Sequence, residues 1–165
     1  MKTAVIYKSK YGATKRYAEW ISEELQCPIF EHSQIKSADL DAYDLIIYGG
    51  GMYAGSIAGV RKIIKNYRND LVVFVSGLSD PADADIREIM IRNELGVAKL
   101  FVFHGGYEFD KLTFRDKLII RVVRKAMSKD MTQEEKAAMY GNVIDFTDRA
   151  AIAPLVEYVN DIAVK

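Results

Sequence analysis

The sequence predicts an α/β protein whose doubly wound, five-stranded parallel sheet lies between two helical layers, a three-layer α/β/α arrangement. Short apolar runs rich in Val, Ile, Phe and Tyr alternate with segments of helical spacing through the first two thirds of the chain. The apolar runs are uninterrupted, as is typical of strands buried on both faces. The connections between them are short, which favours parallel strands joined by right-handed crossovers.

The elements follow one another in a regular order. We expect strands over residues 3–7, 28–31, 45–48, 71–75 and 99–103. Apolar residues at helical spacing predict helices over residues 13–25, 57–67, 82–95 and 148–164. Pro154 lies inside the last of these, so that helix either kinks there or begins its regular part near this residue.

Residues 105–146 form a long connection between the fifth strand and the last helix. A few residues would be enough to join two such elements, and long connections are usually functional. Because this segment has helical patterns of its own, we expect an ordered insertion. No repeat or linker divides the 165 residues, which predicts a single domain over residues 1–165.

Composition narrows the possible partners and compartments. Lys and Arg together number 23, as do Asp and Glu, so the charge balance indicates no nucleic-acid partner. The single cysteine, Cys27, excludes an internal disulfide framework and a cysteine-rich zinc site. No apolar run is long enough to span a bilayer, and the first residues resemble a strand rather than a signal peptide. We therefore expect a cytoplasmic, soluble protein.

The loop after the first strand has the composition of an anion site. It reads Ser9-Lys10-Tyr11-Gly12-Ala13-Thr14 and opens a helix, whose backbone N–H groups and dipole attract anions. The alternative is that Thr14 only caps the helix while Gly12 serves the turn. The loop lacks the Gly-Lys-Ser/Thr ending of a nucleotide P-loop, and no acidic pair follows the strand to hold magnesium. A monophosphate bound without a metal is the remaining ligand.

These residues resemble a known family signature. The pattern Val5-Ile6-Tyr7-x-Ser9-x-x-Gly12-x-Thr14-x-x-x-Ala18-x-x-Ile21 is similar to that of flavodoxins. The resemblance implies a flavodoxin-like fold and flavin mononucleotide (FMN) as cofactor. It also implies that the phosphate is bound by the first loop, that is, by Ser9, Lys10, Tyr11, Gly12, Ala13 and Thr14.

Two further loops are expected to meet the flavin ring. Three glycines at 49–51 suggest close approach of the backbone, and a peptide there can turn its carbonyl toward the flavin N5. The alternative is an ordinary glycine-rich turn. The expected ring contacts are Gly50, Gly51, Met52, Tyr53, Ala54 and Gly55 from the second loop, with Ser76, Gly77 and Leu78 from the third. No protein side chain is expected to be catalytic, because the flavin N5 carries the chemistry.

The insertion contains a basic amphipathic segment over residues 111–129. It contains seven Lys and Arg residues and only one acid, Asp116, and its apolar residues fall at helical spacing. Such a helix can lie in a membrane interface, grip substrate carboxylates, or dock on the sheet with a solvated basic face. The candidate contacts to substrate or lipid are Arg115, Arg121, Arg124 and Lys125.

The second half of the chain resembles one branch of the flavodoxin superfamily. Gly105-Gly106-Tyr107, Phe114-Arg115-Asp116, Leu118-Ile119-Ile120-Arg121 and Asp145-Phe146-Thr147-Asp148 are similar to the menaquinone-dependent protoporphyrinogen IX dehydrogenase group. That resemblance implies an FMN-dependent oxidoreductase, peripheral on the inner face of the cell membrane, that passes electrons from the porphyrinogen to a quinone or redox partner protein. The alternative is a soluble electron carrier, although such flavodoxins are typically acidic and this chain has no net charge.

Overall fold

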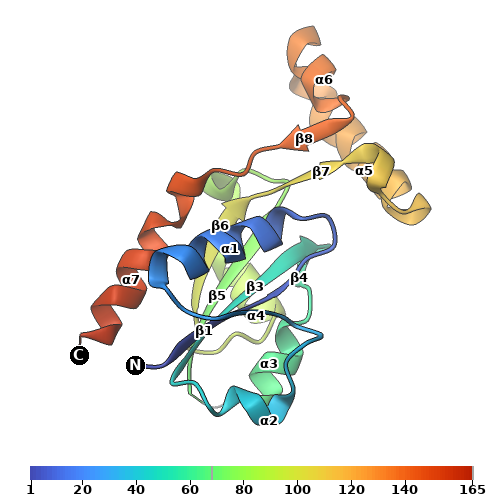
Figure 1. The fold of residues 1–165 in the computed structure, drawn as a ribbon. Helices are drawn as coiled ribbons and strands as arrows, with labels where there is room; N and C mark the ends of the chain where they lie inside the picture. Colours follow the sequence, from blue (N-terminus) through green and yellow to red (C-terminus); the bar gives the residue numbers. More distant parts are fainter. Residues whose placement is uncertain (68, 165) are drawn as a thin grey trace.

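The computed structural model describes residues 1–67 and 69–164, in which a central sheet lies between helices (Figure 1). Five parallel strands take the order β2-β1-β3-β5-β6, and β4 (Ser56–Ile57) adds antiparallel to the end of β3. The parallel strands are β1 (Thr3–Lys8), β2 (Ile29–Glu31), β3 (Leu45–Tyr53), β5 (Asp70–Gly77) and β6 (Lys99–His104). This is the strand order of flavodoxin-like doubly wound sheets, so the predicted fold class is confirmed.

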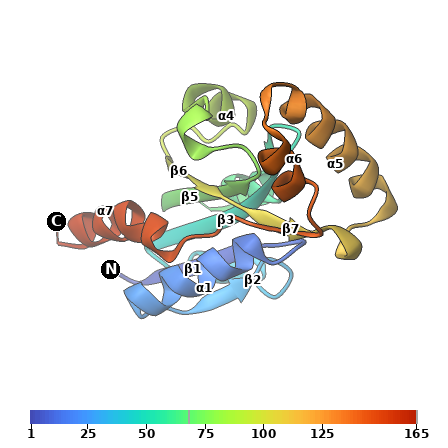
Figure 2. The same ribbon diagram turned by 90° about the horizontal axis from the view of Figure 1, so that it is seen from above.

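Alternating residues of the buried strands face the two helical layers. In β3, Leu45 and Ile47 pack with α1 (Ala13–Leu25) and α7 (Ala153–Ala163). Their neighbours Ile46 and Tyr48 pack on the other face, which is covered by α3 (Val60–Asn66) and α4 (Ile86–Arg92). Figure 2 shows α1 and α4 on opposite sides of the strands. Burial on both faces explains why these strands are continuous apolar runs.

Several helices are shorter than their patterns predict. Ile57 belongs to β4, so α3 begins only at Val60. A 3₁₀ turn (Pro81–Asp83) precedes α4, which starts after Asp85 because that side chain accepts a hydrogen bond from the Glu88 N–H. A second 3₁₀ turn (Arg149–Ile152) precedes α7, which has a proline in its first turn. The regular part of the last helix therefore begins near Pro154. A short helix, α2 (Ser37–Leu40), was not predicted.

The insertion is ordered and lies at one end of the sheet. Its strands β7 (Gly106–Glu108) and β8 (Val143–Asp145) pair antiparallel and enclose α5 (Phe114–Met127) and α6 (Gln133–Met139). Short 3₁₀ turns (Phe109–Lys111 and Ser128–Asp130) flank α5. Figures 1 and 2 show α5 and α6 at the end of the sheet opposite both termini. Among the described residues, no helix has the length and apolarity needed to cross a bilayer.

Candidate functional site

The three loops predicted to form the site meet at the carboxyl end of the sheet. The Thr14 hydroxyl from the first loop lies 2.7 Å from the Ser76 hydroxyl at the end of β5. A Cβ added to Gly51 would lie 3.6 Å from the same Thr14 oxygen, and one added to Gly77 would lie 3.3 Å from the Cβ of Met52. Ligands of open α/β sheets bind at this edge, so the position suits a binding site.

The first loop leaves the start of α1 open. Gly12 adopts a left-handed conformation with φ 99°, and its N–H donates to the Ser9 hydroxyl oxygen at 3.0 Å. A Cβ on Gly12 would meet no other heavy atom of the described residues within 4 Å, leaving out its chain neighbours. In the part of the chain that the structure describes, no side chain caps α1. An uncapped helix start with open space before it fits an anion such as a phosphate.

The alternative interpretation, in which Thr14 only caps the helix, is wrong. The Thr14 side chain is buried and shares a hydrogen bond with Ser76. Each hydroxyl has one proton and two lone pairs, so the partner that accepts keeps its own proton for another acceptor. If Ser76 donates, Thr14 retains a proton to give to a ligand. Ser9, which accepts from Gly12, keeps its proton in the same way.

The second loop differs from the expectation. Residues 49–51 are not part of an open loop but of β3, where Gly49 and Gly50 pair with both β1 and β5, and Gly51 pairs with β5. Packing explains these glycines: a Cβ on Gly49 would come within 2.0 Å of the Phe74 ring, and one on Gly50 within 2.6 Å of Ile57. A peptide flip at Gly50 or Gly51 would break strand pairing. The expectation that the strand ends at Tyr48 is therefore wrong, whereas contact of Gly50 and Gly51 with the flavin ring stays a prediction.

The chain reverses instead in a two-residue hairpin turn. Ala54 and Gly55 both have positive φ, 47° and 78°, as in the tight turns that join antiparallel strands. Tyr53 precedes the turn and is 53% exposed, so its ring is available to a ligand. The half-buried Met52 lies beside Gly77 of the third loop.

Two residues at the end of α4 hold this hairpin turn. The buried Asn93 donates to the Gly55 carbonyl at 3.0 Å and accepts from the Ile57 N–H at 2.7 Å. Arg92 donates to the Ala54 carbonyl at 3.1 Å. Neither residue was predicted to take part in the site, because nothing in their local pattern distinguishes them from other polar residues at a helix end.

The insertion packs on the first and third loops. Its small core of Tyr107, Leu112, Ile120 and Ile144 contacts Tyr11 from the first loop and Leu78 from the third. Both loop residues were predicted to contact the cofactor, and the structure gives each of them a packing role against the insertion as well.

Asp116 of α5 binds the first loop directly. Its carboxylate lies 2.5 Å from the Lys10 ammonium and accepts a hydrogen bond from the Tyr11 hydroxyl. The pKa of Asp116 is lowered below its ordinary value, mainly by the hydrogen bond from Lys10 and to a smaller extent by that from Tyr11. The hydrogen bond to Asp116 in turn raises the pKa of Lys10. No role was predicted for Asp116, although it is the lone acid of the basic segment 111–129, which was a signal.

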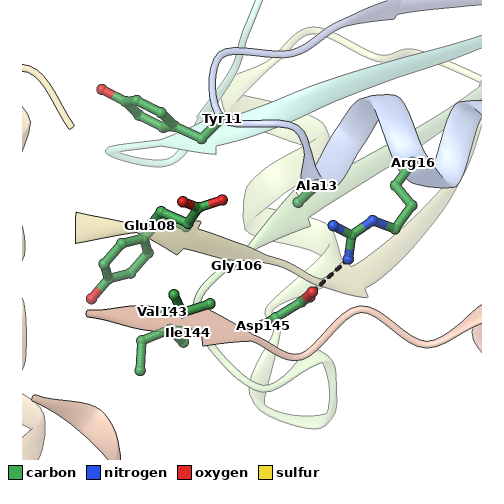
Figure 3. A pocket seen from close by; sticks show the side chains of 9 residues that line it. Tyr11, Ala13, Arg16, Gly106, Glu108, Val143, Ile144 and Asp145 are labelled. Carbon is green, nitrogen blue, oxygen red and sulfur yellow. Dashed lines mark hydrogen bonds and ion pairs between the residues drawn. The ribbon is translucent and has the colours of Figure 1, made fainter. Parts of the chain in front are cut away.

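A small pocket of about 50 Å³ lies between the start of α1 and the β7–β8 ribbon (Figure 3). An ion pair between Arg16 and Asp145, with a 2.5 Å separation, crosses it. Pockets for small molecules usually measure roughly 300–1,000 Å³, so this pocket is too small for a flavin. It is lined by Tyr11, Ala13, Arg16, Gly106, Tyr107, Glu108, Val143, Ile144 and Asp145.

The four predicted basic contacts fall into two groups. Arg115, Arg121 and Lys125 are exposed on α5. Arg124 is 6% exposed and therefore differs from the expectation. Its guanidinium donates to the Tyr107 hydroxyl at 2.9 Å and to the Gly141 carbonyl at 2.7 Å, and it lies 4.7 Å from the centre of the Phe109 ring. These bonds place Arg124 inside the insertion, where it holds that segment together.

His104 ends β6 close to the third loop. Its imidazole stacks on Phe146 with ring centres 4.2 Å apart, and its Nε2 lies 3.1 Å from the Leu78 carbonyl oxygen. These contacts give His104 a structural role, in joining the third loop to the segment that leads into the last helix. No group of three or more His, Cys, Asp or Glu that could hold a metal ion occurs among residues 1–67 and 69–164.

Comparisons with solved structures gave weak similarities. The matches include a flavodoxin, WrbA-like protein from Agrobacterium tumefaciens (24% identity, TM-score 0.41, covering 49% of this chain and 62% of that one). A flavoprotein in complex with FMN from Lactobacillus acidophilus has 22% identity and a TM-score of 0.44, covering 62% of this chain and 90% of that one. A flavodoxin from the domain Archaea has 19% identity and a TM-score of 0.49, covering 77% of this chain and 99% of that one.

Sequence comparisons gave one result that establishes the family. A search of curated proteins found no match. The family model described as a flavodoxin domain matches residues 4–135, which is well over half of the chain and includes all three loops of the site. The chain therefore belongs to the flavodoxin-domain family.

Proposed function

We propose that this protein binds FMN and passes electrons from a substrate to a quinone or a redox partner protein. The observation that carries the proposal is the uncapped start of α1 beside the hydroxyls of Ser9 and Thr14, in a chain of the flavodoxin-domain family. Helix starts of this kind favour phosphate groups. The Lactobacillus flavoprotein named above is described as a complex with FMN, which supports the same cofactor here.

Different residues would contact the phosphate and the ring of FMN. The hydroxyls of Ser9 and Thr14 and the N–H groups at the start of α1 would hold the phosphate. Met52 and Tyr53 would flank the ring, and the loop from Ser76 to Leu78 would meet its polar edge. Bound FMN supplies the electron chemistry, while the protein supplies position and access. Hydrogen bonds between Asn93 and the backbone of Gly55 and Ile57 keep the hairpin turn that follows Tyr53 in place.

The exposed side of α5 supports a membrane-bound acceptor. Its apolar side chains face outward, with Phe114 74% and Val122 69% exposed. Leu118 and Ile119 lie on the same exposed side, and the basic residues there are Arg115, Arg121 and Lys125. Helices with apolar and basic residues of this kind lie in membrane interfaces, where anionic headgroups attract the cations. A lipid-soluble quinone is available at such a surface. The substrate would be an anionic tetrapyrrole of the protoporphyrinogen type.

A flavin titration followed by a turnover assay tests the proposal. The purified protein should quench FMN fluorescence at one equivalent and oxidise protoporphyrinogen with a menadione-type acceptor. A protein that takes up no FMN would contradict the whole proposal. FMN binding without turnover, combined with reduction by a ferredoxin-type reductase, would overturn the dehydrogenase assignment in favour of a soluble carrier.

Liposome co-sedimentation tests the membrane contact. A triple variant of α5 should lose binding to vesicles that contain anionic lipid; it combines Arg115→Gln, Arg121→Gln and Lys125→Gln. A matched control removes the same charge from exposed positions elsewhere and should bind as the wild type does; it combines Lys36→Gln, Lys65→Gln and Arg87→Gln. Equal binding by both variants would refute a membrane role for α5.

A further inference from the structure

The contact between α5 and the first loop joins parts of the chain that are far apart in sequence. Asp116 and Lys10 are separated by 106 positions, and their charged groups lie 2.5 Å apart. The Tyr11 hydroxyl donates to the same carboxylate and accepts a hydrogen bond from the Thr113 N–H at 3.2 Å. Two consecutive loop residues are thus fixed to the first turn of α5.

The burial of Asp116 makes this contact costly to break. The residue is 6% exposed, and a buried carboxylate is costly unless charged or polar partners compensate for its lost hydration. Lys10 and Tyr11 provide that compensation from the loop, and the Thr113 hydroxyl accepts from the Asp116 N–H at 3.4 Å within α5. Moving α5 away from the loop would leave Lys10 and Tyr11 without this partner. The loop and the insertion are therefore expected to order together.

The fixed residues lie inside the proposed phosphate site. Lys10 and Tyr11 stand between Ser9, which accepts from the Gly12 N–H, and the open start of α1. Holding both side chains restricts the backbone of a short loop, and a loop already in its bound conformation loses less entropy when a ligand arrives. The Lys10 charge is directed to Asp116, which leaves backbone N–H groups and hydroxyls as the donors to the phosphate.

We infer that Asp116 is a positioning residue of the cofactor-phosphate site, through which the insertion sets the affinity of the first loop for a phosphate monoester. The inference rests on the proposed function and deepens it. Because coupling between two sites is reciprocal, a phosphate that orders the loop also stabilises the position of α5. The insertion is then part of the cofactor site as well as a candidate docking surface.

Affinities for FMN and riboflavin, measured by flavin fluorescence, test the inference, because the two ligands differ only in the phosphate. Asp116→Ala and Tyr11→Phe should each raise the Kd for FMN at least about fivefold while the Kd for riboflavin changes less than about twofold. Asp110→Asn, which removes an exposed acid of the same insertion, should leave both constants unchanged. Tyr11→Phe keeps the ring in the insertion core and so separates the hydrogen bond from packing.

Hydrogen exchange provides a second readout. FMN should slow amide exchange in α5 of the wild type, and Asp116→Ala should abolish that protection. An unchanged ratio of FMN to riboflavin affinity in both variants, or tighter FMN binding once Lys10 is released, would overturn the inference. A wild-type protein that binds neither flavin would instead overturn the proposed function, so the two failures are distinguishable.

Discussion

The sheet and the insertion are stabilised in different ways. Both faces of the sheet are covered, and its central side chains, such as Ile47 and Phe74, have no exposed surface. The insertion has a core of four apolar residues, and two charged residues, Asp116 and Arg124, are buried beside it. The sheet thus depends on apolar burial, whereas the insertion depends on hydrogen bonds to buried charges.

This difference predicts two levels of stability. Apolar burial over the whole sheet gives a cooperative core, while regions with few buried apolar contacts open locally at lower cost. The insertion also exposes the apolar side of its longest helix, which contributes nothing to its stability in water. We expect the insertion to open without unfolding the sheet. The free energy of that opening should depend on the hydrogen bonds between the insertion and the first loop.

The largest effect is expected from truncating the sheet core. Phe74 packs against Phe103 and fills the space above Gly49. Phe74→Ala should reduce the free energy of unfolding by about 3–5 kcal/mol, the usual cost of removing a buried aromatic ring. Urea denaturation followed by circular dichroism measures the change. A loss below about 1 kcal/mol would mean that the core is far less tightly packed than the contacts indicate.

A smaller and local effect is expected from Arg124. Arg124→Gln removes a buried cation that donates to Tyr107 and to the Gly141 carbonyl. Hydrogen bonds from charged groups contribute about 1.5–3 kcal/mol each, so protection from amide exchange should fall across residues 106–145. Lys125→Gln, on the exposed side of the same helix, is the matched control and should change nothing. If Arg124→Gln instead shifts global unfolding as Phe74→Ala does, the two regions form one cooperative unit.

The hairpin held by Asn93 provides a comparison on the sheet side. Asn93→Ala leaves the Ile57 N–H and the Gly55 carbonyl without their partner, at a cost of about 1–3 kcal/mol. Amide exchange should accelerate in residues 52–57, and the insertion should keep its protection. Equal acceleration of exchange in both segments would show that the hairpin and the insertion are coupled and do not open separately.

The smallest expected effect is the pH dependence of the Asp116 contact. The lowered pKa of Asp116 gives stabilisation that is present above 3.8 and lost as the pH falls through the lowered value. The raised pKa of Lys10 gives stabilisation that is present below 10.5 and lost as the pH rises through the raised value. NMR signals of α5 should therefore be unchanged from about pH 5 to 9 and broaden in acid. An acid transition that persists in Asp116→Asn would assign it to another group.

Sequence patterns predicted the sheet well because each strand contains its own signal. Runs such as residues 45–48 and 71–75 are apolar regardless of their neighbours, and their alternation with helices indicates a parallel, doubly wound sheet. Gly49 and Gly50 were predicted to lie beyond the strand end but continue β3, and the side chains that require glycine there, Phe74 and Ile57, lie elsewhere in the sequence. Local patterns do not report such tertiary contacts.

The insertion was harder to predict for a related reason. Arg121 and Arg124 are indistinguishable by composition, yet one is exposed and the other buried. Hydrophobic periodicity places the buried side of a helix under its apolar residues. In α5, however, Phe114 and Val122 face outward, and the buried side carries Asp116, Ile120 and Arg124. Their hydrogen-bond partners come from other elements, so the buried side could not be identified from the helix alone.

Backbone amide chemical shifts of the first loop test the central claim most directly. When FMN is added to the isotopically labelled protein, we expect large chemical-shift changes for the amides of Tyr11, Ala13 and Thr14. Riboflavin, which lacks the phosphate, should leave these amides almost unmoved while it still shifts Tyr53. FMN binding that leaves the amides at the start of α1 unchanged would contradict a phosphate site in this loop.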